Sequence, residues 1–247
     1  TLLSLLQQED IAILDMFVHA SIIDGCKGTN TKFFKHNDID SLEKTLKNCK
    51  DSYRTKIIAI DGVYSMDGDI APLDKIVEVA KKYDAYIFID EAHATGVIGK
   101  NGRGTLEYYK VEGEIDLVSG TFSKALGGVG GFITGKKEII ELLNFYSRSY
   151  MFSTAMSPAT CASLLAAIDV IETEPEIRDK LWNNIFYFRQ QLKTLGFNIG
   201  NSETAIFPII IGDDFQTKEI CRELHEMNIY VNPVDRKSTR LNSVTRS

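Results

Sequence analysis

The stretch that decides the fold is IDLVSGTFSKALGGVGG, residues 115–131. Its apolar start is typical of a buried strand, and small hydroxyl residues follow where that strand would reach the edge of a sheet. A lysine, Lys124, comes next, and the loop behind it is too rich in glycine for a regular helix. The four glycines of this loop are Gly127, Gly128, Gly130 and Gly131. The pattern predicts a strand that brings Lys124 to a sheet edge.

A phosphate-binding loop of the Walker type is another familiar pattern of glycine, lysine and serine. It needs a glycine immediately before the lysine and a serine or threonine immediately after it. Here Ser123 precedes Lys124 and Ala125 follows it, which excludes that pattern. An ordinary surface lysine in a glycine-rich turn remains an open interpretation of this stretch taken alone.

A second stretch predicts charged side chains at the same edge. The apolar run at residues 86–89 ends in Asp90, and His93 follows three residues later. In an open α/β sheet, ligands bind beyond the carboxyl ends of the strands. A carboxylate at a strand end with a histidine close behind it therefore indicates a functional site.

These two stretches together resemble the fold-type I enzymes that depend on pyridoxal phosphate (PLP). Residues 90–104, DEAHATGVIGKNGRG, and residues 120–128, GTFSKALGG, are similar to the α-oxoamine synthases in particular. Residues 63–73, VYSMDGDIAPL, extend the resemblance, which runs from about His19 to about Val234. That family condenses a small amino acid with an acyl-CoA thioester. The resemblance implies a PLP-dependent acyltransferase that makes an α-oxoamine and releases CoA and carbon dioxide from alanine, serine or glycine.

The resemblance implies catalytic roles for three residues. Lys124 would hold the cofactor covalently and then take the α-proton of the amino acid. Asp90 would keep the nitrogen of the cofactor ring protonated, because a close carboxylate raises the pKa of a neighbouring base. His93 would lie beside the phenolic oxygen of the cofactor and help to position the substrate.

The resemblance also implies that four further residues bind the cofactor. His19, in the segment HASIIDG, would stack on the cofactor ring, although on its own it reads equally as a helix cap. Ser65 would donate to the phenolic oxygen, whereas the residues alone indicate a turn. Ala92 would leave room for the other face of the ring, and Thr121 would bind the phosphate.

Ser153 and Thr154 precede a long apolar helix, and their local interpretation is a helix cap. The resemblance instead places these hydroxyls against the cofactor phosphate of the other subunit. It therefore implies a homodimer with a shared active site, and an amino acid and an acyl-CoA as the other partners.

Composition limits the possibilities. The chain has 247 residues, 44% of them hydrophobic, and a net charge of -6, so nucleic acid is not an expected partner. No apolar run approaches the roughly 20 residues of a membrane span, and the acidic start is unlike a signal peptide. We expect a cytoplasmic protein. The four cysteines are widely spaced and predict buried free thiols, with neither a metal site nor disulfides: Cys26, Cys49, Cys161 and Cys221.

The order of apolar segments predicts an α/β fold, with a mostly parallel central sheet and helices on both faces. Strands are predicted at residues 11–17, 56–60, 86–90, 115–121, 131–134, 205–211 and 229–231. Helices are predicted at residues 19–24, 40–48, 72–83, 136–147, 159–171, 174–195 and 217–227, with Asp40 or Ser41 as the cap of the second.

We expect residues 1–172 to form the large PLP-binding domain and residues 173–234 to form part of a smaller carboxyl-terminal α/β domain. Residues 235–247 switch abruptly to basic and hydroxyl side chains and are expected to be a non-native tail. The resemblance implies further segments on both sides, so the chain looks like an inactive fragment from the middle of an enzyme.

The sequence leaves three rival functions. DEAH is also a helicase motif, for which a basic groove would be expected, but the acidic chain and the glycine-rich Lys124 loop argue against a helicase. A catalytically inactive partner subunit is opposed by the presence of Lys124, Asp90 and His93. A PLP-dependent aminotransferase would keep the cofactor and change the reaction. Within the synthases, residues 148–153 favour a serine-using, long-chain branch and residues 94–99 favour the biotin-pathway branch.

Overall fold

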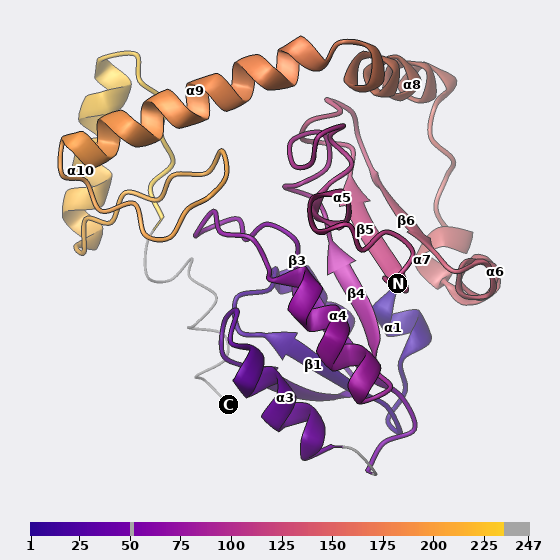
Figure 1. The fold of residues 1–247 in the computed structure, drawn as a ribbon. Helices are drawn as coiled ribbons and strands as arrows, with labels where there is room; N and C mark the ends of the chain where they lie inside the picture. The colour runs from indigo at the N-terminus through magenta and orange to yellow at the C-terminus, as the bar shows by residue number, and fades with distance from the viewer. Residues whose placement is uncertain (50–51, 235–247) are drawn as a thin grey trace.

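The computed structural model describes residues 1–49 and 52–234, which form one six-stranded sheet flanked by helices (Figure 1). The strand order is β2-β1-β3-β4-β5-β6; the first five strands run parallel, and β6 is antiparallel to β5. The strands are β1 (Ile11–Asp15), β2 (Asn30–Phe34), β3 (Lys56–Asp61), β4 (Tyr86–Asp90), β5 (Leu117–Thr121) and β6 (Gly131–Gly135). The predicted mostly parallel sheet is confirmed.

Ten helices accompany the sheet in the described residues. They are α1 (Leu2–Leu5), α2 (Ala20–Gly25), α3 (Ile39–Lys47), α4 (Leu73–Lys82), α5 (Thr105–Tyr109), α6 (Lys137–Tyr146), α7 (Arg148–Met151), α8 (Pro158–Thr173), α9 (Pro175–Thr194) and α10 (Asp214–Glu226). No helix in the described part of the chain combines the length and apolar character that crossing a membrane would require.

Alternating side chains of the strands divide the core into two layers. Ile11 and Ile13 of β1 point to the face covered by α3 and α4, where Leu42, Leu46, Leu73 and Ile76 complete one cluster. The intervening residues Ala12 and Leu14 point to the opposite face and pack with α1, α2 and α6. Successive side chains of a strand project to opposite faces, so an unbroken apolar run needs cover on both sides. Helices on both faces provide it, as predicted.

The cap predicted for the second helix was wrong by two or three residues. Asp38, rather than Asp40 or Ser41, caps α3, and its side chain accepts a hydrogen bond from the backbone N of Ser41 at 2.9 Å. The physical reason is that a cap residue needs extended backbone, which Asp38 has and which Asp40, inside the helix, cannot adopt.

Two predicted strands do not form. Residues 205–211 and 229–231 are irregular, although both are apolar. An apolar run becomes a strand only when its backbone pairs with a neighbour, and the described chain offers these segments no ladder. Conversely, β2 was missed, because three of its five side chains are exposed and give no apolar signal. The helices α1, α5 and α7 were also missed, and the strand predicted at residues 11–17 ends at Asp15.

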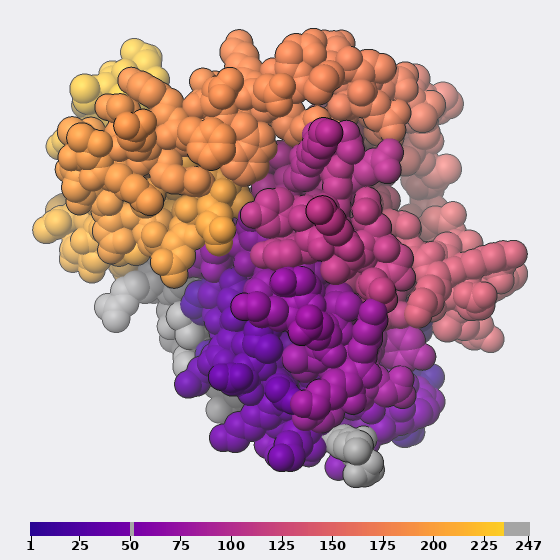
Figure 2. Space-filling view, in the orientation of Figure 1, coloured from indigo at the N-terminus to yellow at the C-terminus, as the bar shows by residue number. Residues whose placement is uncertain are grey.

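The carboxyl-terminal segment packs against the loops at one end of the sheet. Figure 1 shows α9 extending from α8 across that end, and Figure 2 shows its atoms directly against the loops that follow β4. Trp182 donates from Nε1 to the carbonyl of Val97 at 3.0 Å, and Arg178 donates from Nη2 to the carbonyl of Lys100 at 2.5 Å. These bonds attach α9 to the loop that carries His93.

Two of the predicted buried thiols are confirmed and two are not. Cys26 and Cys49 are buried free cysteines, whereas Cys161 and Cys221 on α8 and α10 are only half-buried. The helices that carry the latter pair lie outside the two core layers, which explains their exposure. The predicted tail, residues 235–247, lies outside the described residues.

Candidate active site

The carboxyl ends of the central strands meet at one edge and bring polar side chains together there. Asp61 of β3 pairs in register with Asp90 of β4, and Asp90 pairs with Ser119 of β5. Thr121 ends β5 two residues later. Because parallel strands end at the same edge, residues 29 positions apart in the chain become neighbours in each of these two pairs, as expected for a ligand site in an open α/β sheet.

A cavity of about 160 Å³ lies beside this edge. Ala92, His93 and Lys124 all line it, so the structure brings together three of the residues predicted from two separate motifs. Residues 204–206 line its other side. Sequence reasoning missed this last contribution, because it placed residues 205 and 206 in a predicted strand and gave no signal that residues 204–206 approach Lys124.

Asp90 ends β4 in a half-buried position. Its Oδ1 atom accepts a hydrogen bond from the backbone N of Ala92 at 2.9 Å, and the next residue, Glu91, donates its backbone N to the carbonyl of Ser119 at 2.8 Å. These bonds fix the start of the loop that carries His93. An aspartate held in this way can face a cationic ring nitrogen without reorganisation.

Lys124 occupies a tight loop after β5. The backbone N of Gly127 donates to the Lys124 carbonyl at 3.0 Å, and that of Gly128 donates to the carbonyl of Phe122 at 2.7 Å. Gly127 has a φ of 61°, in the left-handed region that favours glycine. The turn leaves the Lys124 side chain exposed at the cavity, which suits an amine that must reach a ligand.

Two hydroxyls stand side by side at the end of β5. Thr121 Oγ1 lies 2.8 Å from Ser123 Oγ, and the backbone N of Ser123 donates to Thr121 Oγ1 at 3.2 Å. Thr121 is not among the residues that line the cavity with Lys124. Adjacent hydroxyls and backbone N–H groups are suitable donors for phosphate oxygens.

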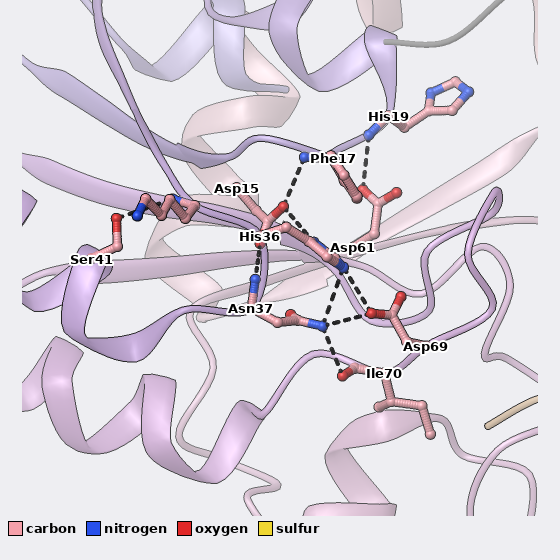
Figure 3. A network of polar contacts seen from close by, with 10 residues as sticks. Asp15, Phe17, His19, His36, Asn37, Ser41, Asp61, Asp69 and Ile70 are labelled. Atoms are coloured by element: carbon pink, nitrogen blue, oxygen red, sulfur yellow. Dashed lines mark hydrogen bonds and ion pairs between the residues drawn. The ribbon is translucent and has the colours of Figure 1, made fainter. Parts of the chain in front are cut away.

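His19 caps α2. Its Nδ1 atom lies 2.7 Å from Ser21 Oγ and accepts from the backbone N of Ser21 at 3.3 Å, which confirms the capping interpretation. Its own backbone N donates to Asp61 Oδ1 at 3.1 Å. Figure 3 shows the His19 ring projecting beyond Asp61. The ring is exposed at the sheet edge, and its stacking on a cofactor stays a prediction.

Ser65 begins a turn behind β3, as its local sequence predicted. The turn is closed by a bond from the backbone N of Gly68 to the Tyr64 carbonyl at 2.8 Å and by one from the N of Tyr64 to the Asp69 carbonyl at 3.1 Å. Thr204 Oγ1 donates to the Gly68 carbonyl at 2.8 Å. The residues that complete the cavity therefore also hold the Ser65 turn.

Ser153 and Thr154 are not brought to this cavity within the chain. Both are exposed in the loop between α7 and α8, and Ser153 Oγ donates to the carbonyl of Ser149 at 2.5 Å. The predicted capping role falls instead to Ser157, which accepts from the backbone N of Thr160 at 3.2 Å. Both residues are exposed, so their side chains can face another contact surface.

Glu91 is a residue that sequence reasoning did not assign a role. It is buried, and its carboxyl group accepts hydrogen bonds from the backbone N of Thr105 at 2.7 Å and from the Thr105 hydroxyl. Burial raises the pKa of Glu91 to about 7, with a further increase from the charge of Asp90, while the bonds from Thr105 act in the opposite direction. Glu91 thus joins the two ends of the loop at residues 91–105.

The donor set at this edge fits PLP. A primary amine and a histidine share one cavity, a carboxylate ends the adjacent strand, and two hydroxyls follow the next strand. These groups match the aldehyde, ring nitrogen and phosphate of that cofactor. Within the described residues, no group of three or more histidine, cysteine, aspartate or glutamate side chains is placed to hold a metal ion.

Comparison with known proteins identifies the family. A model of the aminotransferase class I and II family matches residues 1–246. The chain therefore belongs to this family. The 8-amino-7-oxononanoate synthase of Thermoanaerobacter pseudethanolicus is 47% identical over 223 residues, which are 90% of this chain and 56% of that protein. The corresponding enzyme of Alkaliphilus oremlandii is 43% identical, over 95% of this chain and 60% of that protein.

Solved structures of related enzymes have a similar fold. Serine palmitoyltransferase from S. paucimobilis, solved with bound PLP and myriocin, superposes with a TM-score of 0.87 and 37% identity, covering 94% of this chain and 61% of that chain. The 8-amino-7-oxononanoate synthase of Francisella tularensis has a TM-score of 0.77 and 27% identity, covering 94% and 68%. The predicted fold type and the resemblance to α-oxoamine synthases are confirmed. The chain spans 56 to 60% of the length of the two curated relatives.

Proposed function

We propose that the protein is a PLP-dependent acyltransferase that joins a small amino acid to an acyl-CoA, with loss of carbon dioxide. The observation that carries this proposal is the shared cavity of Lys124, His93 and Ala92, next to Asp90 at the sheet edge. The relatives named 8-amino-7-oxononanoate synthase and serine palmitoyltransferase support the same reaction class.

Each residue has a defined task in this proposal. When bound, PLP supplies an electron sink for the negative charge left on the α-carbon of the amino acid. Lys124 Nζ takes and returns the α-proton, and the Asp90 carboxylate stabilises a positive ring nitrogen. His93 orients the substrate at the cavity wall. Thr121 and Ser123 donate their hydroxyls to the phosphate.

Residues 204–206 would exclude water from the reacting atoms. They line the cavity together with His93 and Lys124, and Thr204 is itself buried. A drier cavity strengthens the electrostatic action of Asp90 and disfavours hydrolysis of a thioester. The carboxyl-terminal segment therefore takes part in the proposed site and is more than a connection to it.

We also propose a homodimer in which each subunit contributes to the other's site. Ser153 and Thr154 are exposed and outside the cavity of their own chain, which supports a contact with a partner's cofactor phosphate. Large apolar side chains on α6, on α7 and directly after α7 are exposed and would gain from burial: Phe145, Tyr146, Tyr150, Met151 and Phe152.

A mixing experiment tests the shared site. Subunits with Lys124→Ala and subunits with both Ser153→Ala and Thr154→Ala should each lose activity alone. Mixed dimers would contain one site with both defects and one site with neither, so activity should return to part of the wild-type level. Absence of recovery, with mixed dimers demonstrated by native mass spectrometry, would contradict the shared site.

The domain division follows from the same arrangement. We propose that residues 1–172 form the large domain, since they contain the whole described sheet and the Lys124 loop. Residues 173–234, which contain α9 and α10, would belong to a smaller domain. Limited proteolysis should then cut first near the junction of α8 and α9.

The reaction is tested in the full-length protein with PLP and each of glycine, alanine and serine, with and without a series of acyl-CoA thioesters. We expect a visible absorbance band that borohydride fixes onto Lys124, located by peptide mass spectrometry, and CoA release only when both substrates are present. Transfer of the amino group to an oxo acid without CoA release would establish an aminotransferase instead. A protein without a bound-cofactor band would be an inactive relative.

A further inference from the structure

A histidine outside the predicted set lies between the two turns that carry His19 and Ser65. His36 follows β2, and its side chain makes two bonds to carboxylates, from Nδ1 to Asp15 Oδ1 at 2.9 Å and from Nε2 to Asp69 Oδ2 at 2.7 Å (Figure 3). A ring that donates from both nitrogens must be the charged imidazolium. His36 therefore bridges the end of β1 and the turn behind β3 as a cation.

Two aromatic rings hold the His36 ring in place. Phe17 stacks on it with ring centroids 4.2 Å apart, and Tyr64 meets it edge-on at 4.4 Å. Phe17 lies two residues before His19, and Tyr64 immediately precedes Ser65. The two residues that pack on the His36 ring are therefore close in sequence to His19 and Ser65, the two residues expected to contact the cofactor.

The first turn is fixed by Asp15. Besides His36, this fully buried carboxylate accepts from the backbone N of Phe17 at 2.7 Å and from that of Asn37 at 2.9 Å. The chain then reaches His19, whose backbone N is bound to Asp61. Residues 15–19 consequently have their path determined by carboxylates on β1 and β3.

The second turn is fixed by Asp69. Its Oδ2 atom also accepts from Asn37 Nδ2 at 3.0 Å, and Asn37 donates further to the Ile70 carbonyl at 3.3 Å. The Asp69 carbonyl closes the Ser65 turn by accepting from the N of Tyr64. His36 and Asn37 together therefore attach this turn to the end of β2.

The balance of charge explains why this histidine stays protonated. Burial opposes the cation, but hydrogen bonds to Asp15 and Asp69, and their charges, outweigh it and raise the pKa of His36 to about 9. The third carboxylate at this edge, Asp61, faces Tyr64, and burial together with the charges of Asp15 and Asp61 raises the pKa of that phenol. His36 is the positive group within this set of carboxylates.

We propose that His36 is a positioning residue, which sets the separation of the His19 and Ser65 turns and thereby orients the ring of the bound cofactor. This inference rests on the proposed PLP function. His36 itself does not line the cavity and is not proposed to touch the cofactor. A merely structural ion pair would stabilise the fold without affecting cofactor orientation, and the experiment separates these two roles.

The experiment compares variants at the two ends of β1. Asp10, immediately before β1, is buried and accepts two bonds from the Arg54 guanidinium at 2.9 and 2.7 Å. Asp10→Asn is therefore a control variant, which weakens the ion pair between a buried aspartate and the exposed Arg54 guanidinium, at the opposite end of the strands. The test variants are His36→Gln and Asp69→Asn. Asp69→Asn keeps the bond between His36 and Asp15, so it serves as the test if His36→Gln does not fold.

Cofactor affinity and the visible circular dichroism of bound PLP are measured in the full-length protein. We expect the test variants to bind PLP about tenfold more weakly, because each removes one partner of a buried charged bond, and to change the dichroic band. Asp10→Asn should lower thermal stability to a similar degree and leave both cofactor readouts unchanged. Test variants that match Asp10→Asn in affinity and dichroism would overturn the inference while leaving the PLP function intact.

A measurement on the protein without cofactor tests whether the His36 ring is the cation that bridges Asp15 and Asp69. Nitrogen-15 spectra of the histidine rings at about pH 8, above the ordinary pKa of histidine, should show His36 with both nitrogens protonated. A neutral His36 ring would overturn the inference whatever the cofactor does. A wild-type protein that binds no PLP would remove the proposed function, and the positioning role with it, even with a charged ring.

Discussion

Trp182 donates its indole N–H to the carbonyl of Val97 at 3.0 Å, across 85 positions of sequence. Trp182 lies on α9, and Val97 lines the same cavity as His93 and Lys124. The bond therefore links the carboxyl-terminal segment directly to a wall of the candidate site.

Removing this donor should loosen the loop. We expect Trp182→Phe, which keeps an aromatic ring but leaves the Val97 carbonyl without its partner, to cost about 1 kcal/mol of unfolding free energy. Hydrogen exchange of amides in residues 95–104 should become faster. Thr194→Val is the control, since the Thr194 hydroxyl donates to the carbonyl of Gln190 within α9 and not to the loop that carries Val97. Equal exchange in both variants would contradict the linking role.

Lys124→Ala should abolish the bound-cofactor absorbance and the condensation together, because Lys124 supplies the one primary amine that lines the cavity among residues 1–49 and 52–234. Absorbance after gel filtration and CoA release are the measurements. Lys137→Ala, at an exposed position at the start of α6, should leave both unchanged. Wild-type activity in the Lys124 variant would end the proposed mechanism.

Asp90→Asn should retain cofactor but lose activity by about a hundredfold or more, since a neutral amide cannot stabilise a positive ring nitrogen. Its Oδ1 atom can still accept the bond from Ala92, so the loop should keep its path. Cofactor content and turnover, measured on the same sample, test this. A variant that turns over normally would remove Asp90 from the site.

Glu91 should make stability depend on pH. Its pKa of about 7 lies above the ordinary 4.5, so the folded state holds the proton more tightly than the unfolded state. The resulting stabilisation is full below about pH 4.5 and is lost as pH rises through about 7. Glu91→Gln does not titrate, so wild-type stability should fall relative to it across this range, by at most about 3 kcal/mol.

Urea unfolding of both proteins at a series of pH values measures this difference. If the unfolding free energies of the two proteins change with pH in the same way, the Glu91 carboxyl does not cause the pH dependence of stability. Glu91→Ala adds a second comparison, because it leaves the buried backbone N of Thr105 without its acceptor and should destabilise the protein at every pH.

The central sheet could be predicted because its strands are buried on both faces. β3 and β4 are nearly continuous apolar runs, and each ends in an aspartate at the sheet edge. β2 could not, since it is an edge strand whose side chains are largely exposed. The apolar segment at residues 205–211 gave the opposite error, because hydrophobicity alone does not reveal whether a backbone will find a partner.

The candidate site was predictable where it depends on short motifs. Ala92, His93 and Lys124 came from the two stretches around them and do share a cavity. The contribution of residues 204–206 to the cavity was not predictable, since Thr204 approaches Gly68 through the packing of the carboxyl-terminal segment. His36 was likewise missed, because its acceptors stand 21 positions before it and 33 positions after it in the chain.

The bond between Thr204 and Gly68 joins residues 136 positions apart, and this separation bears on how the protein is made. During synthesis, the sheet and the Lys124 loop emerge from the ribosome well before Thr204 does. The sheet can therefore assemble first, whereas the cavity receives its last wall only when residues beyond α9 arrive. A nascent chain halted after α8 would possess the lysine and the aspartate, but would lack residues 204–206, which line the cavity beside them.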